Sequence, residues 1–146
     1  MKNISILFLF FLLISGCSTQ RGTIVSLRDL PNKIEWSPEE LATTIAFKKL
    51  YQTNEASFHF VRLAGKEQPH VHDLHDLTIF VLSGKVKMHL NEKSMIATKG
   101  DVIEVPKGII HWAENVNGKP SEAYIVFSPP FDDKDHRIIR DDEKAK

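Results

Sequence analysis

Short β-like runs separated by turn residues fill the sequence from residue 57 to residue 127, and they constrain the fold more than any other feature. The run 85–90 alternates polar and apolar side chains, which is the pattern of a strand with one buried face. Ser83-Gly84 and Pro106-Lys107-Gly108 interrupt the apolar runs in the way that turns do. Many short strands with regular turn signals predict an all-β fold, either a sandwich or a barrel.

One short helix is expected before the strands. Ser37-Pro38-Glu39-Glu40 has the capping-box pattern, with proline at the first helical position, and predicts a helix from Pro38 to about Thr43. Residues 44–51 could extend this helix or form a strand. We favour a strand, because the next residues make a turn into the β-like run 57–63.

The first 16 residues have the composition of a signal peptide rather than of a folded segment. Lys2 supplies a positive charge, and the apolar run 4–14 is shorter than the roughly 20 residues that span a bilayer. The segment ends in Leu13-Ile14-Ser15-Gly16-Cys17, which resembles the lipobox of bacterial lipoproteins. In that motif cleavage precedes the cysteine, which is then lipidated. The alternative is an ordinary secretion signal with an incidental cysteine.

Lipidation of Cys17 would place the protein in the cell envelope, anchored to a membrane. By the same resemblance, Ser18 after the cysteine favours the outer membrane of a Gram-negative cell, with the domain facing the periplasm. Cys17 is the only cysteine. If it carries lipid, a disulfide framework and a cysteine nucleophile are both excluded.

The rest of the chain is long enough for one domain with its own core. Residues 17–30 are interpreted as a tether, 31–131 as the folded domain, and 132–146 as a charged C-terminal tail that is surface-bound or frayed. The chain balances 19 basic against 19 acidic residues. This balance gives no basic excess for binding nucleic acid, and we expect no nucleic-acid partner.

Three histidines are candidate metal ligands. His70 and His72 are two residues apart, and alternate residues of a strand share a face, so both rings can point to one side. His111 must come from another strand, after a turn in which Gly108 can adopt backbone angles that other residues avoid. Imidazole nitrogens suit divalent transition metals, here Fe, Zn, Ni, Cu or Mn. The other histidines of the strands and tail are interpreted as surface or hydrogen-bonded side chains: His59, His89 and His136.

At these residues the chain resembles the cupin superfamily. The second cupin motif matches at every position, namely Gly100, Pro106, Gly108, His111 and Asn115. The first motif matches at Gly65, His70, His72 and Gly84, although four residues rather than five separate Gly65 from His70. The resemblance covers roughly residues 57–130. It implies a jelly-roll-like cupin β-barrel of two antiparallel sheets, with a divalent metal held in the barrel by the three histidines.

One departure from the family pattern concerns the fourth ligand. The glutamate of the first motif falls on Leu77, which cannot bind a metal. The site can therefore have three histidines only, as in some dioxygenases of the superfamily, can take a fourth ligand from a neighbour, or can have lost its metal. Strand alternation puts position 75 on the same face as position 77, so His75 is the candidate fourth ligand.

The resemblance leaves several functions open. The first hypothesis is a metal-dependent oxidoreductase, similar to a dioxygenase, acting on a small organic substrate. The second is a non-catalytic lipoprotein that binds metal or a small ligand, and a third is a structural or sensing cupin. We also expect a homodimer, because small cupins commonly pair and an open barrel has sheet edges that need covering.

Overall fold

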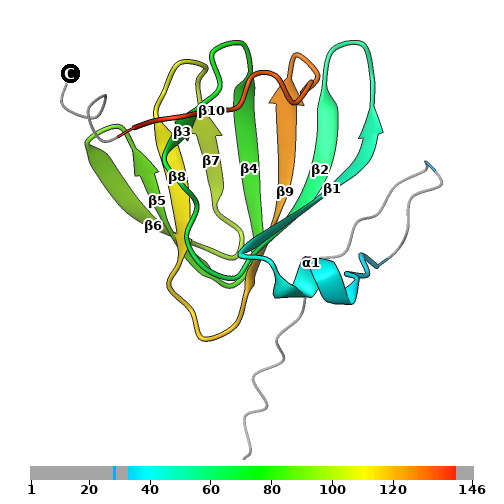
Figure 1. The fold of residues 1–146 in the computed structure, drawn as a ribbon, viewed down its shortest axis with the longest axis vertical. Helices are drawn as coiled ribbons and strands as arrows, with labels where there is room; N and C mark the ends of the chain where they lie inside the picture. The colour runs from blue at the N-terminus through cyan, green and yellow to red at the C-terminus, as the bar shows by residue number, and fades with distance from the viewer. Residues whose placement is uncertain (1–27, 29–32, 141–146) are drawn as a thin grey trace, which may run out of the picture.

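Two antiparallel β-sheets face each other in a computed structural model, which describes residue 28 and residues 33–140 (Figure 1). The elements in chain order are α1 (Pro38–Ala42), β1 (Ile45–Gln52), β2 (Ser57–Leu63), β3 (His70–Val71), β4 (Asp76–Ser83), β5 (Lys85–Leu90), β6 (Lys93–Thr98), β7 (Val102–Val105), β8 (His111–Asn115), β9 (Ser121–Ser128) and β10 (Arg137–Ile138). One sheet has the order β1-β2-β9-β4-β7, and the other has the order β10-β3-β8-β5-β6. This architecture confirms the predicted all-β fold with a short N-terminal helix.

The capping residues set the limits of the helix. The Ser37 hydroxyl accepts a hydrogen bond from the Glu40 backbone N–H at 3.2 Å, and the Glu40 carboxylate accepts one from the Ser37 N–H at 2.7 Å. The helix ends at Ala42, and Thr43 is already extended. The β-branched residues 43–45 favour that extended conformation. Residues 45–52 therefore form strand β1, as predicted, rather than a longer helix.

Alternate residues of each strand build the core between the sheets. In β7, Ile103 and Val105 are buried while Val102 and Glu104 are exposed, which is the two-residue period of a strand with one covered face. The buried cluster draws on strands of both sheets: Leu63, Leu77, Val81, Val86, Met88, Ala97, Ile103, Val105 and Phe127. Burial of this apolar surface is the main stabilising contribution, since within the described part of the chain no disulfide can form.

Several sequence predictions lie outside the described residues. They are the signal peptide, the lipidated Cys17, most of the tether and the end of the charged tail, residues 141–146. Within the residues that are described, no helix has the length and apolar character needed to cross a membrane.

Candidate metal centre

The three predicted histidines come together where the two sequence motifs meet. His70 lies in β3, His72 follows that strand directly, and His111 opens β8. β3 pairs with β8 at His70 and His111, whose ring centroids are 4.4 Å apart. One ring nitrogen from each of the three residues lies within 4.8 Å of the others, a spacing that allows all three to bind one metal ion.

Hydrogen bonds fix the orientation of all three rings. The Nδ1 atoms lie 2.8 Å from the Gln68 carbonyl oxygen for His70, 2.6 Å from that of Asp135 for His72, and 2.8 Å from that of Ile109 for His111. A carbonyl oxygen can only accept, so each Nδ1 carries the proton and each Nε2 keeps its lone pair. Among the described residues, His111 Nε2 is buried without a hydrogen-bond partner. Holding the ring by its other nitrogen is the usual way in which proteins orient histidine ligands.

The electrostatic environment keeps these imidazoles neutral. Burial, followed by the proximity of His70, lowers the pKa of His111 to about 3, and burial lowers the pKa of His72 to about 4. Burial lowers the pKa of His70 as well. Neutral imidazole is the form that binds a metal, so the donor set fits a divalent transition metal without prior loss of a proton near neutral pH.

The turn before β8 is attached directly to the first motif. Gly108 has φ of +79°, the left-handed region that favours glycine, and its N–H donates to the His72 carbonyl oxygen at 2.8 Å. The neighbouring Lys107 N–H donates to the Asp76 carboxylate at 2.9 Å. The Pro-x-Gly turn thus aligns the strand that carries His111 with the segment that carries His72.

His75 is buried beside the three-histidine group but has other partners. Its Nε2 lies 3.0 Å from the Pro130 carbonyl oxygen, and its Nδ1 makes a short hydrogen bond with the Asp135 carboxylate. Asp135 also accepts the backbone N–H groups of Asp73 and Leu74, each at 2.9 Å. A carbonyl oxygen can only accept, so Nε2 donates to Pro130, and Nδ1 is engaged by the Asp135 carboxylate. His75 is not part of the group formed by His70, His72 and His111, but its ligand atom lies within 4.8 Å of those of His72 and Asp135, a second group that could hold a metal ion.

The C-terminal segment packs against the candidate ligands. β10 pairs with β3, placing Ile138 opposite His70, and the Ile139 N–H donates to the Pro69 carbonyl oxygen at 2.8 Å. Asp135 and Ile139 are buried, although sequence analysis assigns both to a surface-bound or frayed tail. His136 is exposed, but its ring centroid lies 4.5 Å from that of His70. Residues 135–139 therefore form part of the site.

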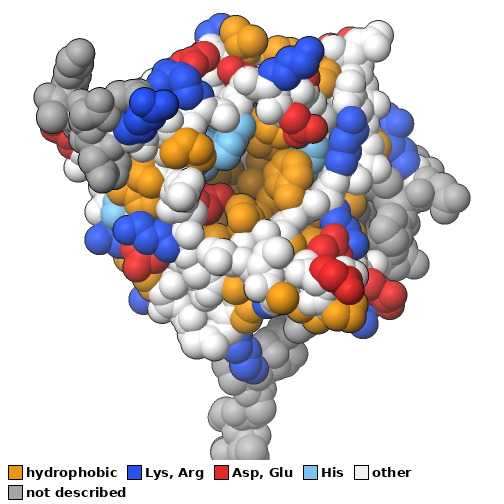
Figure 2. All heavy atoms as spheres, in the orientation of Figure 1, with side chains coloured by type: hydrophobic (Ala, Val, Ile, Leu, Met, Phe, Trp, Pro, Cys, Tyr) orange, Lys and Arg blue, Asp and Glu red, His pale blue; other side chains and the backbone are white. Residues whose placement is uncertain are grey.

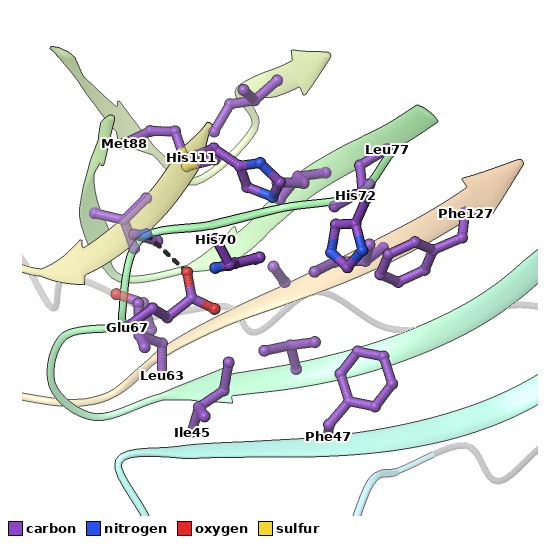
Figure 3. A pocket seen from close by; sticks show the side chains of 18 of the residues that line it. Ile45, Phe47, Leu63, Glu67, His70, His72, Leu77, Met88, His111 and Phe127 are labelled. Carbon is purple, nitrogen blue, oxygen red and sulfur yellow. Dashed lines mark hydrogen bonds between the residues drawn. The ribbon is translucent and has the colours of Figure 1, made fainter. Parts of the chain in front are cut away.

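A cavity of about 360 Å³ lies in front of the three histidines. Figure 2 shows its mouth, with hydrophobic side chains in the hollow and histidine at the rim. Most of its walls are apolar, formed by residues such as Ile45, Phe47, Met88 and Phe127 (Figure 3). Leu77 is 5% exposed and lines this cavity, so the position of the family's glutamate contributes only apolar surface.

Glu67 is a cavity residue that the sequence analysis missed. It belongs to the loop before β3, and its carboxylate accepts the Ala113 backbone N–H at 2.7 Å (Figure 3). Its own N–H donates to the Ala113 carbonyl oxygen at 2.9 Å. Burial raises the pKa of Glu67 to about 7, with the Ala113 hydrogen bond acting in the opposite direction. Glu67 lies outside the group of atoms that can jointly hold a metal with the three histidines.

The remaining residues singled out in the sequence have structural roles. The Asn115 side chain donates to the carbonyl oxygens of Asn117 and Lys119 and accepts the Ser121 hydroxyl at 2.7 Å, which stabilises the turn after β8. His59 is buried and hydrogen-bonded to Ser57. His89 stacks on Trp112, with ring centroids 4.3 Å apart, and neither lines the cavity.

Comparison with known proteins identifies a family and a related sequence. Residues 59–127 match the family model described as a cupin domain. An uncharacterized protein of Aquifex aeolicus (strain VF5) is 34% identical over 112 residues, which cover 77% of this chain and 88% of that protein.

Solved structures show the same fold. KdgF from a Halomonas species superposes with a TM-score of 0.61 at 25% identity, covering 68% of this chain and 90% of that one. TT1209 from Thermus thermophilus has a TM-score of 0.59 at 22% identity, with coverage of 75% and 100%. Pac13, described as a nucleoside dehydratase, has a TM-score of 0.58 at 23% identity, with coverage of 74% and 92%, and a variant of Streptomyces PAC13 with uridine has a TM-score of 0.59.

Proposed function

This chain belongs to the cupin superfamily, and we propose that it binds a divalent transition metal through His70, His72 and His111 and acts on a small organic molecule in the adjoining cavity. The observation that carries this proposal is the orientation of the three rings. Each Nδ1 is held by a backbone carbonyl group, so that three neutral Nε2 atoms remain for one cation. Fe, Zn, Ni, Cu and Mn are the candidate metals.

A metal-dependent oxidoreductase, similar to a dioxygenase, is the function that we favour. A metal bound here would supply Lewis-acid and redox chemistry. The chain itself would contribute three neutral imidazole ligands. Leu77 stands where the family pattern has a glutamate, so no carboxylate from that position would offset the charge of the metal. The apolar cavity walls would exclude water from a bound substrate and so strengthen electrostatic interactions at the centre. His75, with both nitrogens engaged, would orient the site rather than bind the metal.

The metal content of the purified protein tests the site. We expect about one transition-metal ion per wild-type chain, and almost none in the His70→Ala/His111→Ala variant, because a single imidazole binds these ions weakly. His89→Ala, which removes an imidazole outside the cavity, serves as the matched control and should keep the metal. Equal metal in the double variant and the wild type would rule out this centre.

A non-catalytic metal- or ligand-binding protein is the second candidate. It is favoured by the mainly apolar lining of the cavity, in which the acidic residues are Glu67, Glu122 and Asp133. Oxygen consumption separates the two functions. Metal-dependent oxygen uptake with any member of a substrate panel would support the oxidoreductase. Tight rebinding of metal after chelation, with no uptake across the panel, would support the binding protein.

Membrane attachment through lipid on Cys17 is a further part of the proposal, supported by the lipobox-like sequence. Several acyl chains, each contributing about 0.8 kcal/mol per buried CH₂, would hold the protein on the membrane, most simply the outer membrane facing the periplasm. Cys17→Ala should therefore move the protein from the membrane fraction to the soluble fraction of the cell envelope. An unchanged membrane fraction would contradict lipid anchoring.

A homodimer is also proposed. The edge strand β6 exposes Met95 and Ile96, and β7, at the edge of the other sheet, exposes Val102. Apolar edges of this kind are usually covered by another chain or element. Sedimentation of the protein at micromolar concentration should give the mass of two chains, and a monomer mass would contradict the proposal.

A further inference from the structure

Glu67 places a carboxyl group on a cavity wall that is otherwise mainly apolar. One oxygen, Oε2, accepts the Ala113 N–H at 2.7 Å, and the other has no hydrogen-bond partner among the described residues. The two bonds between Glu67 and Ala113 fix the carboxyl group against β8, two residues beyond His111. Figure 3 shows the side chain extending from its loop toward the cavity.

Glu67 is half-buried, and its second oxygen is accessible to the solvent of the cavity, so a bound ligand that displaced this solvent would have to pair with that oxygen. A ligand that removes this oxygen from water without offering a hydrogen bond binds less tightly, whereas a ligand with a donor at this place avoids the loss. Leu63, Met88 and Ala113 line the same cavity and are apolar. A hydrogen-bond donor on a bound ligand would satisfy the second oxygen.

The cavity also restricts the chemical class of that ligand. A volume of about 360 Å³ is near the lower end for ligand pockets and suits a small organic molecule. Among the described residues, no lysine or arginine lines it, and Glu122 and Asp133 add carboxylates. The carboxylates would therefore repel phosphorylated or polyanionic ligands. A ligand with a single anionic group could bind where a metal holds that group.

We propose that Glu67 accepts a hydrogen bond from a hydroxyl or N–H group of a small, largely apolar ligand. The inference rests on the proposed function only in assuming that the cavity is a ligand site. In a ligand that also bound the metal, the Glu67 contact would select for a donor group separate from the metal-binding group. Glu67 is then a specificity-determining residue of the site.

Phenol and toluene are a matched pair of probes, because they differ by one hydroxyl in place of a methyl group. We would titrate each into the metal-free full chain and measure affinity by protein-observed NMR. The wild type should be compared with Glu67→Leu, Glu67→Ala and Glu67→Gln. Glu122→Gln is the control, since it changes another carboxylate that lines the cavity but accepts a hydrogen bond from Ser83.

The ratio of phenol to toluene affinity is the readout, because a purely structural role of Glu67 would change both affinities together. At about pH 8, above the pKa of Glu67 of about 7, a hydrogen bond to the ionised carboxylate predicts a fall in this ratio of about tenfold or more in Glu67→Leu and Glu67→Ala. Glu67→Gln keeps an acceptor oxygen and should lose less, and Glu122→Gln should match the wild type. Two truncating variants are used so that, if one fails to fold, the affinity ratio can still be measured on the other.

An unchanged ratio in both truncating variants would overturn the inference, and so would a wild type that binds neither probe. Metal content is measured on the same purified preparations before the metal is removed for the titrations. If the wild type is purified without metal, the proposed metal function is contradicted. The affinity ratio is measured without metal, so it would still test the role of Glu67.

Discussion

Asp135→Ala should lower the free energy of unfolding of the metal-free chain by about 4 kcal/mol, the loss expected when one partner of a buried ion pair is removed. Asp135 lies in the C-terminal segment, and its side chain is 6% exposed. It accepts hydrogen bonds from the Asp73 and Leu74 N–H groups and from His75. Burial alone would raise the pKa of this carboxyl group, but the His75, Leu74 and Asp73 hydrogen bonds outweigh burial and lower it, so it is ionised at neutral pH.

Removing the carboxylate leaves the His75 ring buried opposite an apolar methyl group. Urea denaturation followed by circular dichroism would measure the loss. The double variant Asp135→Ala/His75→Leu should be less destabilised than the sum of the two single variants, because it leaves no unpaired buried charge. Asp132→Ala, at an exposed position of the same segment, should cost less than about 1 kcal/mol. A loss equally small for Asp135→Ala would contradict the buried-pair interpretation.

The same substitution should weaken metal binding. The Asp135 carbonyl oxygen orients His72 through Nδ1, and its position depends on the side-chain bonds that tie residue 135 to residues 73–75. Loss of an outer partner of a metal ligand typically lowers affinity roughly 10- to 100-fold. Competition with a chelating indicator would measure the change. Affinity equal to that of the wild type would show that the orientation of His72 does not depend on the Asp135 side chain.

The strands and the three histidines could be predicted because each has a local signal. Alternation of polar and apolar residues is visible within six residues, as in residues 85–90. The Pro-x-Gly sequence predicts a turn in which Gly108 has a positive φ, as the structure has it. The histidines at 70 and 72 share a face by strand parity alone. Their convergence with His111 rested on the family resemblance, since strand pairing between distant segments has no signature in one sequence.

Glu67 and the C-terminal segment could not be predicted in this way. The position of Glu67 in the cavity wall depends on how the loop before β3 aligns with β8, through the pairing of Lys66 with Glu114 and the bonds to Ala113. No periodicity marks a single carboxylate in a loop. The charge density of residues 132–146 indicated solvation, but the charges at 135 and 137 have partners in residues 73–75. The apolar pair at 138 and 139 was the available signal that this segment packs.

Acidification should destabilise the metal-free domain well above the pH at which carboxylates titrate. His59, His72 and His111 are buried as neutral rings, and burial lowers the pKa of His59 and His72 to about 4 and that of His111 to about 3. The usual value of 6.5 applies in the unfolded chain. At these three histidines the unfolded chain therefore binds more protons than the folded one between pH 6.5 and about 4, and their contribution to stability falls as the pH falls; the raised pKa of Glu67 opposes this with one group.

The expected size of the effect is large relative to the stability of a small domain. A fall in pKa from 6.5 to about 4 corresponds to roughly 3 kcal/mol for one imidazole, and the contributions of neighbouring rings are not additive. Since domains are usually stable by only about 5–15 kcal/mol, two or three such groups should unfold the metal-free chain near pH 4. Urea denaturation at half-unit steps from about pH 7 to about pH 4 would give the slope.

Two controls separate the individual rings. His59→Phe removes one titrating group outside the metal centre and keeps an aromatic ring stacked near Phe47, so it should reduce the slope and lower the pH of unfolding. Adding Zn²⁺ should also lower that pH if the metal binds the neutral rings of His72 and His111, because a ligand of the folded state competes with protons. A stability that stays constant from pH 6.5 to about 4 in the metal-free wild type would contradict burial of these histidines as neutral groups. If Zn²⁺ leaves the pH of unfolding unchanged, His72 and His111 do not bind this metal, whether or not they are buried as neutral rings.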